Sequence, residues 1–456
     1  MDTSLNFKSY LIIGMMLFAL FFGAGNLIFP AQLGQYAGTE VAIAITGFLI
    51  TGVGLPLLGI LALGYSKSND LRDLSSRVHP IYGLVFTSLL YLTIGPFFAL
   101  PRTAAVAYEI GIAPFTADSS GTVILLVFSI IFFAIALALS LNPLEIVNKI
   151  GKVLSPAILV TLAVLLVAAL FMPMGVIGAP QDNYADSPFL TGFLEGYNTM
   201  DALASLVFGI IVIAAVRKLG VNSAKGVLAA TLKSAVIAAI LLAVVYTGIA
   251  YLGATSTSTL GLLETGGPVL SGASAHYFGT FGQLLLALII TLACLTTAVG
   301  LIVANAGFFN KLTPSINYKI YVVIFSVFSL IVTNAGLANI IAFSIPVLMF
   351  LYPLAIVLIM LAFLSPLFKH RRLVYAAAII VTFFIAAIDG MKTLTASISV
   401  ENPQWLQSII DFYDSILPLY SEGLGWLLPA LATILIAGII ARFSSGEDVT
   451  SAGNQN

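Results

Sequence analysis

The sequence predicts an all-α polytopic membrane protein with about twelve transmembrane helices. The first observation is composition: 60% of the 456 residues are hydrophobic and 8% are charged, whereas about a quarter of a typical soluble domain is charged. A soluble fold with this ratio would lack the polar groups that its surface needs. The second observation is that the apolar segments have the length of helical spans, roughly 20 residues, and not of the alternating strands of a barrel.

The apolar segments follow one another along the whole chain. The first one continues past Pro30 without a cleavage site between small residues, so we do not interpret it as a signal peptide. The predicted spans lie at residues 10–36, 40–64, 81–101, 121–141, 153–172, 191–215, 227–252, 280–307, 319–335, 338–364, 373–390 and 417–441.

The third observation, the distribution of basic residues, predicts the orientation. If the N-terminus is cytoplasmic, sixteen of the eighteen Lys and Arg residues fall on the cytoplasmic side, and only Arg102 and Lys392 fall outside or within a span. Both termini are therefore predicted to be cytoplasmic. The polar segments are assigned as the N-terminus (1–9), an external loop (173–190), a second external stretch with lids or short surface helices (391–416) and a disordered tail (442–456).

Several function classes are disfavoured by the same sequence. A net charge of -1 argues against a nucleic-acid partner, and no phosphate-binding G-x-x-x-x-G-K-[ST] motif is present to drive transport with ATP. A single cysteine, Cys294, and three histidines argue against a disulfide framework or a structural zinc site. His79, His276 and His370 all lie in loops or at span edges, so a membrane-embedded enzyme is the least favoured alternative. We expect no cofactor and no obligate protein partner.

The first span contains residues that are poor helix formers in mid-membrane. Gly23, Gly25, Asn26 and Pro30 fall within eight residues of one another. One interpretation is a small-residue face for helix packing. The other is an unwound segment that divides the span into two half-helices, with freed amides that attract a carboxylate and freed carbonyls that attract a cation.

The sixth span has a similar composition, with glycine, asparagine and acidic residues at 195–202. In the predicted topology it runs opposite to the first span and lies five spans later. Two broken helices of opposite direction are typical of an inverted repeat. We therefore predict a five-plus-five architecture, with repeats at 10–172 and 191–364 and two further spans at 365–441.

Two pairs of polar residues in the spans are candidates for a functional role. A carboxylate inside a span costs roughly 2.5–3.5 kcal/mol on insertion scales, so Asp201 is expected to act as a cation counter-charge or gate. Glu195 lies nearer the outer end, where it could equally be solvated. Thr296 and Thr297 in the eighth span could bond to their own helix, or their hydroxyl oxygens could bind an alkali cation.

With these features, the chain resembles the bacterial branched-chain amino acid:cation symporters. The resemblance rests on the segment from Gly23 to Pro30, on residues 197–209 and on the twelve spans. That family transports leucine, isoleucine and valine with sodium, and it shares the leucine-transporter fold. The resemblance implies a sodium-coupled importer in a bacterial plasma membrane, with sodium as the coupling ion.

The resemblance also implies an ion site between the first and eighth spans. Its sodium ligands would be the hydroxyls of Thr296 and Thr297 and the carbonyls of Ala293, Ala19 and Phe22.

The candidate substrate site lies at the two breaks. The resemblance implies that Gly23 and Gly25 offer amides to the substrate carboxylate, and that Asn26 with Thr199 serves a possible second ion. A rival mechanism on the same fold is proton coupling, with the proton carried by Asp201. The candidate substrate-binding residues are Gly23, Ala24, Gly25, Asn26, Tyr197, Asn198 and Asp201.

Overall fold

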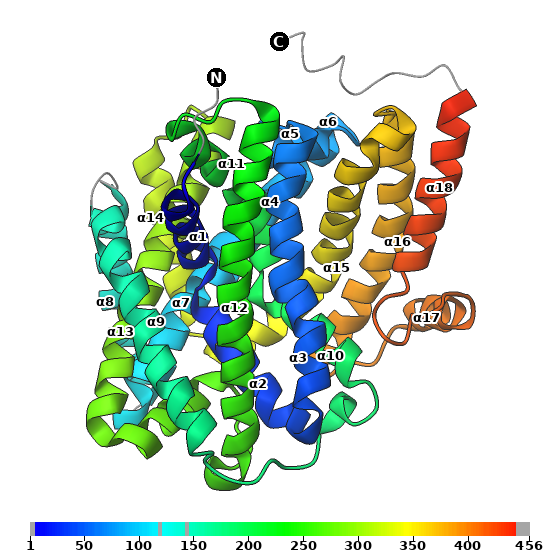
Figure 1. Ribbon diagram of the computed structural model, residues 1–456. Coiled ribbons are helices and arrows are strands. Elements are labelled where there is room, and N and C mark those ends of the chain that lie inside the picture. Colours follow the sequence, from blue (N-terminus) through cyan, green and yellow to red (C-terminus); the bar gives the residue numbers. More distant parts are fainter. Residues whose placement is uncertain (1–4, 117–120, 142–145, 444–456) are drawn as a thin grey trace.

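The computed structural model describes residues 5–116, 121–141 and 146–443, without the side chains of 146–155 and Ile210. All the regular structure within these residues is helical, and the helices form one elongated bundle (Figure 1). By length and composition, seven of the described helical stretches could cross a membrane, and four shorter apolar helices accompany them. The predicted tail lies beyond residue 443, apart from its first two residues, and therefore falls outside the described residues.

The first half of the chain carries the first five predicted spans, three of which are composed of more than one helical piece. The pieces are α1 (Phe7–Phe21) and α2 (Ala24–Ala37); α3 (Val41–Leu49), the π-helix η2 (Ile50–Gly54) and α4 (Leu55–Ser66); α6 (Pro80–Leu92), the π-helix η3 (Thr93–Phe97) and α7 (Ala99–Gly111); α8 (Gly121–Leu141); and α9 (Ile146–Phe171). The short α5 (Leu71–Ser76) joins the second span to the third.

The second half begins with the broken sixth span and ends with the two appended spans. Its elements are α10 (Pro188–Glu195), the 3-10 turn η7 (Gly196–Thr199) and α11 (Asp201–Lys218); α12 (Ala224–Leu260); α13 (Gly266–Leu312); α14 (Tyr318–Thr333); α15 (Leu337–Leu364); α16 (Arg372–Ser397); α17 (Gln404–Ile416); and α18 (Leu427–Phe443).

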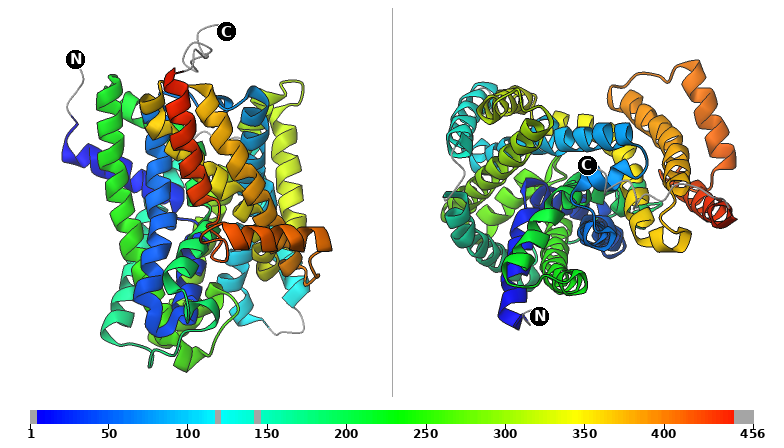
Figure 2. Two further views of the ribbon diagram at one scale, coloured as in Figure 1. Left: turned by 90° about the vertical axis from the view of Figure 1, so that its right-hand side faces the viewer. Right: turned by 90° about the horizontal axis from the view of Figure 1, so that it is seen from above.

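The arrangement in space places the two breaks inside the bundle. Helices α15, α16 and α18 lie on one side and α8, α9 and α14 on the other, with α2 and α12 between them (Figure 1). Helix α17 lies across the bundle axis at the periphery (Figure 2), so the stretch at 391–416 does contain a surface helix. The start of α1 and the end of α18 lie at the same end of the bundle (Figure 1).

The predicted fold class is confirmed, and helix covers at least part of each predicted apolar segment. Several predicted boundaries differ from the observed helix ends, among them those of the third and the last span. The third span does not end at Pro101, because α7 begins at Ala99 and continues to Gly111. Proline in a first helical turn removes no intrahelical hydrogen bond and is tolerated there. The last span does not begin at 417: residues 417–426 form turns, and α18 begins only at Leu427.

Glycines allow the two halves of the chain to approach each other at backbone distance. A Cβ atom on Gly34 of α2 would lie 2.0 Å from the carbonyl oxygen of Ala250 in α12, and one on Gly253 would lie 2.2 Å from that of Ala31. Small residues of this kind are typical of helix contacts in membranes, where close packing replaces the hydrophobic effect as a driving force. The α2–α12 contact therefore depends on the absence of side chains.

This contact predicts a stability difference between two glycines. We expect Gly253→Ala to lower stability by about 1–3 kcal/mol, because the added methyl would overlap the Ala31 carbonyl and force the helices apart. Gly300→Ala in α13 is the matched control, since nothing lies within 4 Å of its Cβ position. Thermal unfolding of both variants in detergent is the measurement, and equal midpoints would contradict the prediction.

Candidate functional site

The first break separates α1 from α2 at two extended residues. Phe22 has ψ 91° and Gly23 has φ -120° and ψ -165°. The Gly23 amide donates a hydrogen bond of 2.9 Å to Oδ1 of Asn26, whereas in a continuous helix it would bond to the carbonyl of Ala19. The segment is thus two half-helices, and the alternative of an intact helix with a packing face is wrong. The last carbonyls of α1 and the first amides of α2 flank the break.

The second break lies between α10 and α11. The 3-10 turn Gly196–Thr199 is followed by Met200 in the left-handed region, with φ 63°, and α11 then begins at Asp201. The change in direction frees the carbonyls of Asn198 and Thr199 from helical hydrogen bonding. Both oxygens instead accept hydrogen bonds from Arg102, at 2.7 Å from Nη1 and 3.4 Å from Nη2.

A buried polar cluster joins the two breaks. The side-chain amide of Asn26 donates to Oδ2 of Asp201 at 2.5 Å and also to the hydroxyl of Tyr246. The Tyr246 hydroxyl donates in turn to the same Asp201 oxygen at 3.2 Å. All three side chains are at most 4% exposed. The first, sixth and seventh spans are therefore linked through polar groups in an otherwise apolar bundle.

Arg102 is one of two residues of this site that the sequence did not predict. It lies in α7, is 3% exposed and has its guanidinium carbon 5.1 Å from the ring centre of Phe29. It also interacts electrostatically with Asp201. Ending the third span at Pro101 left Arg102 at the membrane edge. The apolar, alanine-rich segment that follows it up to Tyr108 could have indicated that the third span continues past Pro101.

Tyr246 was also missed. Tyrosine is ordinary in a membrane helix, and no neighbouring residue in the sequence marks this one as different. For Glu195, the sequence left a functional and a solvated carboxylate as alternatives. Its side chain is partly buried and accepts a hydrogen bond of 2.8 Å from the side chain of Asn198. It therefore has a partner within the sixth span.

The predicted ion ligands lie on the elements that face the first break. A Cβ atom on Gly23 would lie 3.5 Å from the methyl carbon of Thr297, so the eighth span packs against the break. Thr296 donates to the carbonyl of Ala293 at 2.9 Å. The hydroxyl is back-bonded, but its oxygen retains lone pairs beside the Ala293 oxygen. The structure thus places the α13 part of the predicted ion site beside the α1–α2 break.

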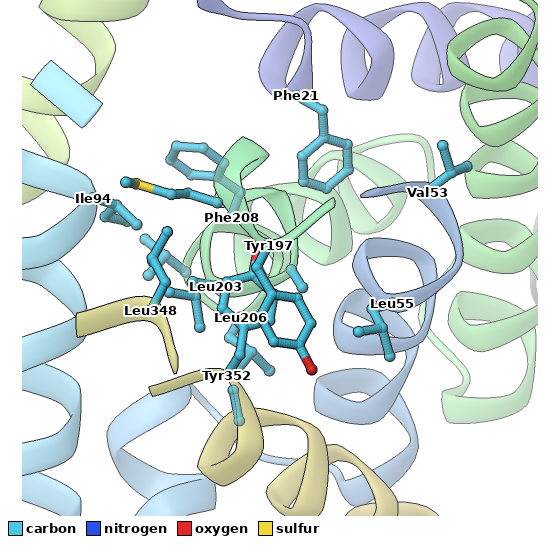
Figure 3. Close-up of a cluster of buried hydrophobic side chains, with 14 of the residues drawn as sticks. Phe21, Val53, Leu55, Ile94, Tyr197, Leu203, Leu206, Phe208, Leu348 and Tyr352 are labelled. Carbon is cyan, nitrogen blue, oxygen red and sulfur yellow. The ribbon is translucent and has the colours of Figure 1, made fainter. Parts of the chain in front are cut away.

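Apolar side chains surround the breaks on several sides (Figure 3). Phe21 of α1, Ile94 of η3 and Phe208 of α11 are all buried and belong to this cluster. Tyr197 of η7 stacks on Tyr352 of α15, with ring centres 4.1 Å apart and an interplanar angle of 12°. Half-helix ends, a polar cluster and apolar walls together suit the binding of a small molecule that carries opposite charges and an apolar group.

Comparison with solved structures agrees with this fold. The inward-facing conformation of Mhp1 has a TM-score of 0.57 and 15% identity, with 95% of this chain and 90% of that chain covered. A manganese transporter from Eremococcus coleocola has a TM-score of 0.55 and 12% identity, with 97% of each chain covered. At these identities the likeness concerns the fold alone.

Comparison of sequences is more specific. The family model for "Branched-chain amino acid transport protein" matches residues 6–444. The branched-chain amino acid permease BrnQ of Bacillus subtilis (strain 168) is 49% identical over 433 residues, which cover 95% of this chain and 97% of the relative. The permease BraB of the same organism is 47% identical over 443 residues, which cover 97% and 98%. The chain therefore belongs to the family of branched-chain amino acid transport proteins.

Proposed function

We propose that this protein is a sodium-coupled secondary transporter that imports leucine, isoleucine and valine. Family membership and the names of the relatives, which are permeases and not enzymes, support the substrate class and the transport activity. The observation that carries the proposal is the pair of helix breaks joined by Asn26 and Asp201. Such breaks persist in a membrane only where the freed backbone groups are buried in protein or line a cavity.

The substrate would bind across the two breaks. The amides of Ala24 and Gly25 at the start of α2 form a helix N-terminus that favours the α-carboxylate. The Gly23 amide, which was also expected to serve it, donates to Oδ1 of Asn26 instead.

The ammonium group would meet carbonyl oxygens of both broken helices other than those of Asn198 and Thr199, which accept from Arg102. The side chains of Tyr197 and Asn198 would lie beside the ammonium group. The branched side chain would pack against apolar residues of the third, sixth and eighth spans, of which Ile94 and Phe208 adjoin the breaks (Figure 3).

The coupling ion would bind between α1 and α13. Its ligands would be the carbonyls of Ala19, Phe22 and Ala293 and the hydroxyls of Thr296 and Thr297. Sodium can drive transport only if it binds the outward-open and inward-open states with different affinities, since an ion that binds both equally shifts no population. We propose that it stabilises the outward-open state and leaves on the cytoplasmic side.

We further propose that the protein lies in the bacterial plasma membrane with both termini in the cytoplasm. The shared end of the bundle for α1 and α18 (Figure 1) and the distribution of basic residues both support this orientation.

The proposal predicts that a sodium gradient alone drives leucine uptake. In proteoliposomes with the proton gradient collapsed, an inward sodium gradient should stimulate uptake of radiolabelled leucine, and an equal potassium gradient should not. Alanine and proline, which lack a branched side chain, should be poor substrates. Uptake that ignores sodium and follows an imposed proton gradient would instead favour the rival in which Asp201 carries the proton.

The ion site predicts a specific effect of one hydroxyl. Thr297→Val should raise the sodium concentration for half-maximal uptake by about fivefold, because one oxygen ligand worth about 1 kcal/mol is lost. Thr382→Val is the control: Thr382 is buried in α16, and its hydroxyl donates only to Ala378 in its own helix. An unchanged sodium requirement in Thr297→Val would remove this residue from the site.

The substrate site predicts a steric block at Gly25. A Cβ atom there would lie 2.9 Å from Nη2 of Arg102, so Gly25→Leu should fill the break and abolish leucine binding. Gly300→Leu, whose Cβ position has no neighbour within 4 Å, should bind leucine normally. Equilibrium binding of radiolabelled leucine to the purified variants is the measurement, and normal binding by Gly25→Leu would place the substrate elsewhere.

A further inference from the structure

Arg102 is a buried cation that the coupling scheme above leaves without a role. It is 3% exposed, and its Nε has no hydrogen-bond partner among the described residues. Its two terminal nitrogens donate to the carbonyls of Asn198 and Thr199, which the second break has freed. These oxygens end the outer half of the sixth span, where the helix dipole favours positive charge.

The two residues expected to serve a second ion are already engaged. Oδ1 of Asn26 accepts from the Gly23 amide, and its Nδ2 faces Asp201 and Tyr246. The hydroxyl of Thr199 donates to the carbonyl of Gly196 at 2.9 Å and accepts from the amide of Asp201 at 3.3 Å. The freed carbonyl of Thr199 is taken by Arg102. The oxygens that could bind a second sodium therefore have other partners.

The residues around the guanidinium group of Arg102 accommodate it. Gly25 leaves the space that its side chain requires, and the ring of Phe29 lies against its face. Asp201 lies close enough to interact with it electrostatically. A free cation bound at the same carbonyls would add a second positive charge beside Arg102, and the two charges would repel each other.

We propose that Arg102 is a tethered cation that takes the place of a second coupling ion, with Asp201 as its counter-charge. The inference rests on the proposed sodium-coupled function and sharpens it. A covalently attached cation contributes positive charge to the breaks but is never released into the cytoplasm, so it adds nothing to the driving force. Transport then couples to one sodium ion per amino acid, bound between α1 and α13.

The stoichiometry of the intact protein tests this inference directly. In proteoliposomes clamped at zero potential, a sodium gradient of about tenfold should sustain a leucine gradient of about tenfold, whereas two ions per leucine would sustain about a hundredfold. A hundredfold gradient would overturn the role of Arg102 and leave sodium coupling intact. Failure of sodium to stimulate uptake at all would instead overturn the proposed function.

Variants of Arg102 provide the second test. Arg102→Gln removes the tethered positive charge beside Asp201, and it should bind leucine about thirtyfold or more weakly at low sodium. High sodium should restore binding with a steeper, two-ion dependence, because a free ion can then occupy the vacated carbonyls. Arg102→Lys should keep the tethered charge, so leucine binding should still depend on one sodium ion.

Arg77→Gln is the matched control, since Arg77 also donates to a backbone carbonyl, that of Ser66, but lies away from the breaks. It should leave leucine affinity and sodium dependence unchanged. Unchanged leucine affinity in Arg102→Gln would overturn the proposal. So would weakened binding that keeps a one-ion dependence in Arg102→Gln, because it would give Arg102 a structural role only. If that variant does not fold, the stoichiometry of the intact protein decides.

Discussion

The structure depends on how unpaired backbone groups at two helix breaks are satisfied within the membrane. The hydrocarbon core of a bilayer supplies no water to pair with such groups, and each unsatisfied amide or carbonyl costs several kcal/mol there. At the first break, the side chain of Asn26 accepts from the Gly23 amide. At the second, Arg102 donates to two freed carbonyls. The third span is therefore needed to stabilise the break in the sixth.

The same groups bind the two halves of the chain together. Asn26 belongs to the first half, whereas Asp201 and Tyr246 belong to the second. Around this polar centre, the glycine contact between α2 and α12 brings the backbones close, and the Tyr197–Tyr352 stack fixes η7 against α15. Because the candidate ligands come from both halves, a rigid-body movement of one half against the other would alter the site directly.

Features that depend on local sequence were predicted well. The breaks in the first and sixth spans follow from glycine and asparagine in apolar segments, and these residues weaken a helix wherever it lies. The end of the third span and the start of the last span were predicted less well. Pro101 was interpreted as a stop, but the same residue is harmless in the first turn of α7. The last span was predicted from 417, although Ser421, Glu422, Gly423 and Gly425 all precede the actual start of α18 at Leu427.

By itself, the sequence determined the membrane location, the helical class and the two breaks, and it predicted Asp201 as an acid beside the second break. Composition and spacing carry this information because each charged side chain or helix break inside a bilayer costs free energy. Only the tertiary structure decided which residues meet at the breaks. Arg102 is ninety-six residues from Asn198 along the chain, and Tyr246 is 220 residues from Asn26. No local pattern encodes these contacts, because they arise where separate helices pack against one another.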